Sequence, residues 1–365
     1  MLLPRRYTVL IITFTALVLS ASAYAGLYGY SHTDSELLSE RIDVPPRHIM
    51  NYRKDMRNLV STLALYGKSR NHDFQVLVHE GQYLLDKSLW EYHLSGYNQI
   101  RKKQGYVDDI SFLSFDIPET DEESPAIVDR YISQIDGIVV NNHYCAGTPL
   151  DSLITDLEIP VISIEECPND NKLDKAIEAS FLDKRAIYPF LYRSKAFKNI
   201  YHQLIINENA ENIHKIKGAK NVSFLINDED FIDPYKMIDD IRNSNYDIVI
   251  IKPVFQNTIP FSKEDVNAMK YKKNGARRLI LAMYNVSELA DTDYLWNKRW
   301  TKHKPDWLAA KSLVTNDAYI AEYWRPEWRQ IVAKYYKSIV DSDYDGVFLT
   351  GLENHIYFER NKPLE

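Results

Sequence analysis

The stretch Asp247–Ile251, with the sequence DIVII, decides the fold class. It is a short, almost continuous apolar run rich in β-branched side chains, which is typical of a strand buried on both faces of a parallel sheet. A weaker run at Ile110–Phe115 is a candidate extra strand. Seven further runs of the strong kind occur along the chain: Phe74–His79, Gly137–Val140, Ile159–Ile164, Ala186–Phe190, Val222–Ile226, Leu279–Val286 and Gly346–Leu349.

Helical patterns separate these runs. Arg47–Tyr66, Ala126–Ile135, Pro234–Ile241 and Pro326–Val340 are amphipathic stretches, and Pro326 suits a first helical turn because its missing N–H is not needed there. Strands that alternate with helices predict βαβ units. Eight such units predict an α/β fold of the (β/α)8 TIM-barrel type, and an open doubly wound sheet is the alternative.

The N-terminus has the pattern of a secretory signal peptide over residues 1–25. Arg5 and Arg6 precede the apolar run Tyr7–Ser20, and Ala23–Ala25 offers a small-x-small cleavage site. The run is shorter than the roughly 20 residues that span a bilayer, so we expect a secreted or periplasmic protein. Membrane attachment is expected only if the segment stays uncleaved.

After this segment we expect a leader over residues 26–46 and a single barrel domain over residues 47–365. Two long insertions, near residues 82–125 and 291–322, interrupt the strand–helix pattern. In a barrel, both would follow strands at the C-terminal face, where active sites are built from the loops.

Composition excludes some partners. The net charge of -7 offers no basic surplus to neutralise phosphates, so we expect no nucleic-acid partner. There is no glycine-rich nucleotide loop, no H-E-x-x-H motif and no Cys/His cluster, so we expect neither a cofactor nor a metal. The two cysteines, Cys145 and Cys167, both follow apolar runs, and neighbouring parallel strands would bring them within reach of a disulfide in an exported protein.

Several segments resemble the family 114 glycoside hydrolases, extracellular barrel proteins related to endo-α-1,4-polygalactosaminidases. Ala282–Glu288 is similar to a family strand that ends in a glutamate, and Tyr294 and Trp296 follow at the family's distances. Ala321–Trp328 resembles the segment W-x-P-x-W. Tyr344–Leu349 and Tyr246–Ile251 resemble two further strands of the family.

The N-terminal half resembles the family in a different order. Tyr52–Val60, Phe74–Gly81 and Ile135–Ile138 look like segments that usually follow the strand resembled by Tyr344–Leu349. We therefore expect a circular permutation of the barrel, which is feasible because the termini of a domain commonly lie close together. The resemblance touches residues 45–360 and is clearest over residues 246–350.

The resemblance implies carboxylate chemistry on an amino-sugar-containing polysaccharide. Glycosidic cleavage usually needs two carboxyl groups. Glu288 occupies the position of the motif's glutamate, and Glu80 and Glu165, each at a strand end, are candidates for the second group. For each of these residues, a structural or solvated charge is the alternative role. The candidate sugar-binding residues are Lys252, Asn141, Tyr284, Tyr294, Trp296, Trp324 and His79.

Three strand ends depart from the family. Lys252, Thr350 and Asn141 stand where the family has acidic residues, and Ser287 replaces a glycine. These departures lead to two hypotheses of function. The first hypothesis is an exported glycoside hydrolase acting on a polysaccharide or oligosaccharide. The alternative is a catalytically degenerate barrel that binds carbohydrate in an exopolysaccharide or cell-envelope system.

Aspartates at the strand starts have a different predicted role. Asp136, Asp247 and Asp345 precede their strands and would lie at the N-terminal end of the barrel, opposite the predicted active site. We expect these three to form turns and to stabilise the barrel.

Overall fold

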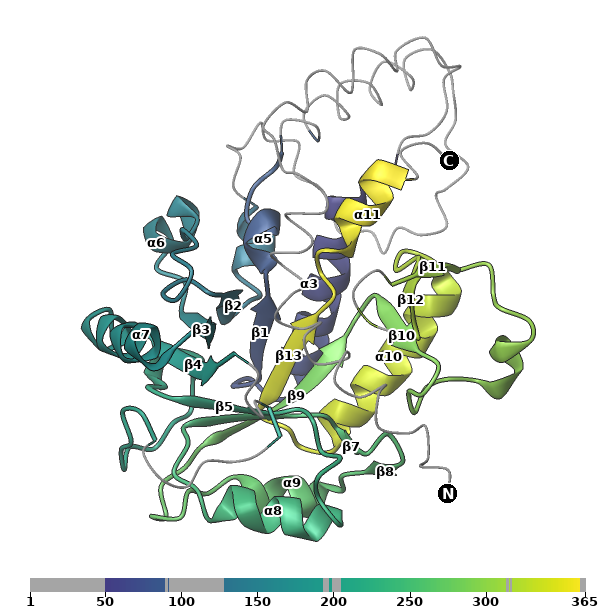
Figure 1. The fold of residues 1–365 in the computed structure, drawn as a ribbon. Coiled ribbons are helices and arrows are strands. Elements are labelled where there is room, and N and C mark those ends of the chain that lie inside the picture. Colours follow the sequence, from purple (N-terminus) through teal and green to yellow (C-terminus); the bar gives the residue numbers. More distant parts are fainter. Residues whose placement is uncertain are drawn as a thin grey trace, which may run out of the picture.

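The computed structural model describes residues 50–88, 91, 128–192, 197–198, 205–312, 315 and 317–361. Its main feature is a sheet of eight parallel strands (Figure 1). Each of the eight expected strong runs overlaps one of these strands: β1 (Gln75–His79), β2 (Gly137–Asn141), β3 (Val161–Cys167), β4 (Ala186–Leu191), β5 (Val222–Leu225), β6 (Ile248–Ile251), β9 (Leu279–Asn285) and β13 (Gly346–Thr350).

The strand order is that of a nearly closed barrel. Hydrogen-bonded neighbours run β4-β3-β2-β1-β13-β9-β6-β5, so each strand lies beside its predecessor in the chain and β13 pairs with β1. The two ends of this order, β4 and β5, also meet: the rings of Tyr188 and Phe224 lie 5.3 Å apart. The strand order and this contact confirm the expected α/β barrel rather than the alternative, an open doubly wound sheet.

Helices cover the outside of the barrel (Figure 1). Two of the expected amphipathic stretches give long helices, although the first begins five residues later than expected, at Tyr52 rather than Arg47. As expected, Pro326 occupies the first turn of its helix. The helices are α3 (Tyr52–Arg70), α5 (Asp129–Ile132), α6 (Ser152–Asp156), α7 (Asp170–Leu182), α8 (Pro234–Arg242), α9 (Lys263–Met269), α10 (Pro326–Asp341) and α11 (Asn354–Asn361), with short 3-10 turns η1 (Gly81–Leu84), η3 (Ile216–Gly218) and η4 (Lys298–Thr301).

Two apolar layers hold the barrel together. Side chains alternate along each strand, so every second residue fills the interior and the others pack under the helices. Phe224, Leu281 and Phe348 belong to the interior cluster, whereas Val249, Ile280 and further residues pack outward against the helices. The interior is therefore a packed core.

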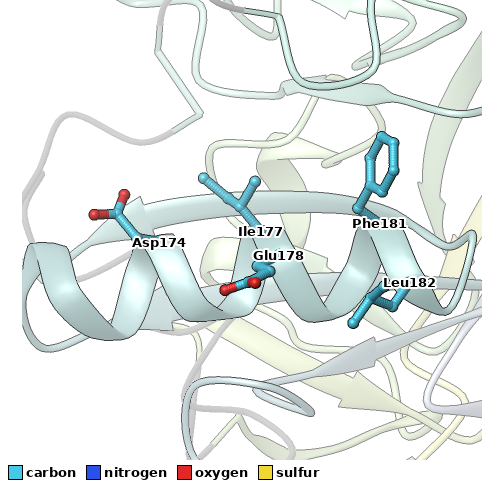
Figure 2. A pocket seen from close by; sticks show the side chains of 5 residues that line it. All are labelled: Asp174, Ile177, Glu178, Phe181 and Leu182. Carbon is cyan, nitrogen blue, oxygen red and sulfur yellow. The ribbon is translucent and has the colours of Figure 1, made fainter.

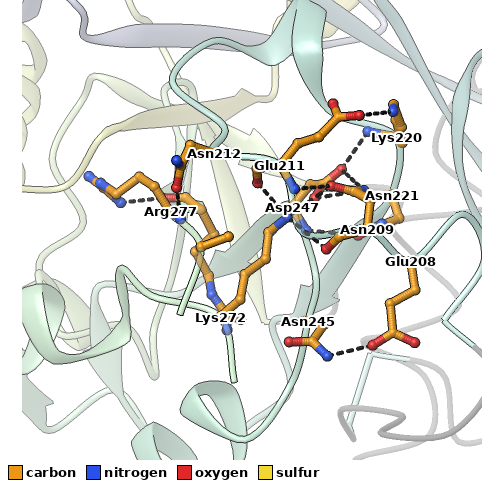
Figure 3. Close-up of polar contacts among 12 residues, drawn as sticks. Glu208, Asn209, Glu211, Asn212, Lys220, Asn221, Asn245, Asp247, Lys272 and Arg277 are labelled. Atoms are coloured by element: carbon orange, nitrogen blue, oxygen red, sulfur yellow. Dashed lines mark hydrogen bonds and ion pairs between the residues drawn. The ribbon is translucent and has the colours of Figure 1, made fainter. Parts of the chain in front are cut away.

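The aspartates at the strand starts have the structural role expected of them. Asp247 accepts a hydrogen bond from the backbone N–H of Lys220 at 2.7 Å and pairs with Lys272 at 2.5 Å, in a network that Figure 3 shows. Asp136 accepts from the N–H of Val76 at 2.8 Å, and Asp345 accepts from the N–H of Ile280 at 2.9 Å. Each carboxylate thus ties its own strand to a neighbour at the N-terminal end of the barrel.

The second insertion builds a small sheet beside the barrel mouth. Its strands are β10 (Glu288–Ala290), β11 (Leu308–Lys311) and β12 (Ala318–Ala321), in the order β10-β12-β11. A two-stranded ribbon of β7 (Val254–Phe255) and β8 (Ile259–Pro260) follows β6.

Other expectations lie outside the described residues. These are the signal peptide over residues 1–25, the leader over residues 26–46, the run at 110–115 and most of the insertion near residues 82–125. Among the helices that the structure describes, none combines the length and apolar character needed to cross a membrane.

The two cysteines form a disulfide. Cys145, in the loop after β2, is bonded to Cys167 at the end of β3, with the two Cα atoms 5.3 Å apart. Parallel pairing of β2 with β3 brings these strand ends together, as the sequence predicted.

Candidate functional site

A cavity of about 290 Å³ opens at the C-terminal end of the barrel. Its walls come from the ends of β1, β5, β6, β9 and β13 and from the small sheet that begins at β10. Among the predicted site residues, Glu288, Lys252, His79, Tyr284 and Tyr294 line this cavity. This is the end of a barrel at which the loops of such folds carry active sites.

Glu288 is held in this wall by several hydrogen bonds. Its carboxylate accepts from the Ser312 hydroxyl at 3.0 Å, from Asn354 Nδ2 at 3.2 Å, from the Thr315 hydroxyl at 3.3 Å and from Asn285 Nδ2 at 3.4 Å. Burial raises the pKa of Glu288 above its usual value, while these four donors lower it. The donors fix the orientation of the carboxylate and favour its ionised form.

Glu353, which the sequence reading missed, is a second carboxyl group in the same cavity. Burial, and after it the negative charges of Glu288 and Glu80, raise its pKa to about 8. Its Oε2 is buried and accepts no hydrogen bond among the described residues. A carboxyl group in such surroundings is protonated at neutral pH.

A glycine turn brings Glu353 to the cavity. Gly351 follows β13 with a φ of 82°, a left-handed conformation that side chains disfavour. A Cβ atom on Gly351 would lie 2.2 Å from Asn285 Oδ1, so a larger residue does not fit beside β9. The sequence signal for Glu353 was therefore a glycine directly after a strand, followed two residues later by an acid.

The two carboxyl groups have different surroundings. Glu288 accepts four hydrogen bonds, and Glu353 is desolvated without a donor to its Oε2. Environments that separate the proton affinities of two nearby carboxyl groups are the basis of acid–base pairs in glycosidases. The four donors to Glu288 favour its ionised form, whereas the charge of Glu288 raises the pKa of Glu353.

A third carboxyl group, Glu80, interacts electrostatically with Glu353. It follows β1 in a left-handed conformation with a φ of 52°, and Asn141 Nδ2 donates to its Oε1 at 3.0 Å. Burial raises its pKa to about 7. Asn141 Nδ2 also lies 3.0 Å from Nε2 of His79, and burial lowers the pKa of His79 to about 4, so this imidazole is neutral. Glu80 influences Glu353 electrostatically but does not line the cavity.

The structure places Glu165 away from the cavity. Its buried carboxylate accepts from the backbone N–H of Tyr144 at 3.0 Å and of Cys145 at 2.8 Å, and from the hydroxyl of Ser163. These bonds fix the loop that carries the disulfide. The neighbouring Glu166 is partly exposed, and burial raises its pKa.

Lys252 follows β6, the neighbour of β9, and its Nζ lies 3.9 Å from Asp228 Oδ1. Its positive charge lowers the pKa of Glu229 and of Asp293, two further carboxyl groups that line the cavity and whose pKa burial raises. Around this cavity, acidic side chains therefore outnumber Lys252. No group of three or more His, Cys, Asp or Glu side chains in the described part of the chain is placed to hold a metal ion.

Aromatic rings form one side of the cavity. Tyr284 and Tyr335, with ring centroids 5.0 Å apart, line it together with Trp328 and the exposed Tyr294. The predicted Trp324 is instead 3% exposed and packs on Tyr52.

Trp296 also lies outside the cavity and stacks on Tyr319 with ring centroids 5.6 Å apart. The cavity wall has two more buried oxygens without a hydrogen-bond partner in the described structure, the Tyr284 hydroxyl and the Thr350 hydroxyl. Together with Glu353 Oε2, they suit a polar ligand, because unsatisfied buried groups of this kind are uncommon in folded proteins.

A second hollow lies on the outer face of α7 and has a different character (Figure 2). Its five lining residues all belong to one helix, and Phe181 and Leu182 are 65% and 75% exposed. It lacks converging polar groups from several elements, so we place the candidate site in the barrel mouth.

Comparisons with known proteins give relatives but no activity. No protein-family model matches the chain. An uncharacterized protein of Methanocaldococcus jannaschii is 27% identical over 163 residues, which are 43% of this chain and 46% of that protein. An uncharacterized protein of Thermotoga maritima is 22% identical over 125 residues, 33% of this chain and 36% of that protein. The chain thus matches less than half of the length of these curated relatives.

Proposed function

We propose that this protein is an exported glycoside hydrolase that cleaves an amino-sugar-containing polysaccharide in the barrel-mouth cavity. The observation that carries the proposal is the pairing of two unlike carboxyl groups, Glu288 and Glu353, in one cavity at the C-terminal end of a barrel. The resemblance to the family 114 glycoside hydrolases supports it, because Glu288 occupies the position of the family's glutamate. The out-of-order N-terminal segments belong to the same proposal, as a circularly permuted form of that barrel.

The two carboxyl groups take complementary roles in this mechanism. Glu353 donates its proton to the oxygen of the glycosidic bond as the bond to the anomeric carbon breaks. Glu288, ionised, either attacks that carbon or takes a proton from the attacking water. Addition of one water molecule then gives two shorter chains and returns both carboxyl groups to their starting states.

The surroundings of the pair suit an amino sugar. Glu229 and Asp293 add to the negative charge of the cavity, while Lys252 offsets only part of it. A protonated sugar amine would be attracted to these carboxylates. The rings of Tyr284, Tyr335 and Trp328 offer apolar faces of the kind on which sugar rings pack.

A second candidate function is carbohydrate binding without cleavage, within an exopolysaccharide or envelope system. The observation that favours it is the loss of three family acids at Lys252, Thr350 and Asn141. Two of the residues that replace those acids contact other carboxyl groups: Lys252 lies near Asp228, and Asn141 donates a hydrogen bond to Glu80. The two candidate functions differ in whether Glu288 and Glu353 together are sufficient to cleave a glycosidic bond.

The test is product release from partially deacetylated galactosaminoglycan by the wild type, Glu288→Gln and Glu353→Gln. We expect each variant to lose roughly 10²- to 10⁴-fold in kcat, the usual contribution of a general acid or base. Glu166→Gln is the matched control, because Glu166 is at a strand end but outside the cavity, and it should keep wild-type activity. Full activity of both cavity variants contradicts the mechanism. An inactive wild type that binds the polymer selects the second candidate.

A further inference from the structure

A basic lobe adjoins the cavity. It is the segment 297–304 between β10 and β11, which Figure 1 shows as the loop that protrudes beside the small sheet. Five of the seven residues over 298–304 are lysine, arginine or histidine, in a protein whose net charge is -7. Its four strong cations are Lys298, Arg299, Lys302 and Lys304, and all four are exposed.

These cations are not neutralised within the described structure. Among the described residues, no carboxylate lies within 4.0 Å of any of the four, whereas Lys220 and Lys270, for example, each form such a pair. Clustered cations without counter-charges create a positive potential that extends over about a Debye length, roughly 8 Å at physiological salt. A surface of this kind attracts anionic groups.

The lobe is also held in place by a chain of aromatic contacts. Trp296 donates from Nε1 to the hydroxyl of Thr301 at 3.1 Å and contacts Trp300, with ring centroids 5.6 Å apart. Trp300 contacts Trp307 at 5.2 Å, and Trp307 contacts Trp328, a wall residue of the cavity, at 5.4 Å. The basic residues are therefore presented from an aromatic base that is continuous with the cavity wall.

The chain itself also connects the lobe to the cavity. Tyr294 and Leu295 line the cavity, and the basic residues begin three positions later at Lys298. Tyr294 is 49% exposed. A polymer seated in the cavity would thus pass from an acidic pocket across exposed aromatic and basic surface.

We infer that this lobe is a binding surface for acidic groups on a polysaccharide, carboxylate or phosphate, outside the cavity. The continuity of the lobe with a sugar-sized cavity favours a glycan over nucleic acid, as does the overall negative charge of the protein. The cavity and the lobe have opposite charge, so they would bind different units of a chain. This inference uses the charge of the lobe and its position beside the cavity, and it does not require that the cavity hydrolyses anything.

The experiment measures binding of the full-length protein to polygalacturonate and to a phosphomannan, with neutral dextran and single-stranded DNA as comparisons. The test variant carries Lys298→Gln, Arg299→Gln, Lys302→Gln and Lys304→Gln. The matched control removes the same charge from four exposed lysines outside the lobe, through Lys172→Gln, Lys175→Gln, Lys215→Gln and Lys217→Gln.

We expect the wild type to bind at least one acidic polysaccharide, with an affinity that falls as salt rises, and the lobe variant to bind at least tenfold more weakly. The control should bind as the wild type does. The two acidic polymers separate carboxylate from phosphate as the recognised group. The inference is overturned if the wild type binds neither polymer, if the control loses as much affinity as the lobe variant, or if DNA binds as tightly.

A separate readout keeps this result distinct from the proposed hydrolysis. Cleavage of the amino-sugar polymer by the lobe variant should match the wild type, because Glu288 and Glu353 are untouched. Loss of polyanion binding with unchanged cleavage supports the lobe. Absence of cleavage in both proteins contradicts the proposed function and leaves the binding result intact.

Discussion

Replacing Glu353 by glutamine should make the protein more stable at alkaline pH. The pKa of Glu353 is raised from 4.5 to about 8, first by burial and then by the charges of Glu288 and Glu80. Between these two values the folded protein keeps a proton on Glu353 that the unfolded chain has released. The stability of the wild type therefore falls as the pH rises through this window and levels off above about pH 8.

The size of the effect follows from the shift. At 1.36 kcal/mol per pKa unit, the change from 4.5 to about 8 corresponds to roughly 5 kcal/mol. This figure is an upper limit, because water entering the cavity and proton uptake by Glu288 would relieve the repulsion. Glutamine has nearly the same shape as the protonated acid and cannot ionise. The variant should thus equal the wild type near pH 4.5 and exceed its stability above pH 8 by about 2–5 kcal/mol.

Guanidinium denaturation followed by the fluorescence of the six tryptophans measures this difference at about pH 5 and about pH 9. Other buried carboxyl groups titrate in both proteins, so most of their contribution cancels. Glu178→Gln on the exposed face of α7 is the control and should change the free energy of unfolding little at either pH. A gain for Glu353→Gln below about 1 kcal/mol, or one that is the same at both pH values, would refute the assignment of Glu353 as a protonated, desolvated acid.

Two further predictions concern the barrel rather than the cavity. Removing the disulfide through Cys145→Ser with Cys167→Ser should lower the free energy of unfolding by about 3 kcal/mol, from the loop of 22 residues that it closes, and reductant should have no further effect on that double variant. Lys272→Met leaves the fully buried Asp247 without its cation and should cost about 3–5 kcal/mol in urea denaturation. Lys273→Met, at the exposed neighbouring position, should be close to neutral, and equal losses from the two changes would contradict the role given to the buried pair.

The barrel itself could be predicted because its signal is local. Runs such as Ile248–Ile251 and Leu279–Asn285 are buried on both faces, so each shows its apolar composition without knowledge of any neighbour. The aspartates that precede strands were equally readable, since their position at a strand start fixes the end of the barrel to which they belong. Asp247 and Asp345 both take that place.

The site was less predictable because it depends on which strand ends meet. Glu288 was found from its motif, but Glu80 directly follows β1 and Glu165 lies near the end of β3, and only the geometry shows that neither lines the cavity. Glu165 lies at an outward position of β3 and accepts hydrogen bonds from a loop, whereas its neighbour Glu166 faces the other way. Alternation along a strand predicts that one of such a pair faces the mouth, and without the register the sequence does not tell which.

Glu353, which the sequence analysis did not predict, weakens the argument that the loss of the family's acidic residues makes the protein inactive. Thr350 stands at the end of β13 where the family has a carboxylate, yet the chain turns at Gly351 and places Glu353 in the cavity that Thr350 also lines. Glu353, three residues after Thr350, thus provides a carboxyl group at the same strand end. What matters for proton transfer is the position and the surroundings of the carboxyl group, not the residue from which it comes. The substitution at Thr350 is therefore weak support for inactivity, and the catalytic question rests on Glu353 and its partner Glu288.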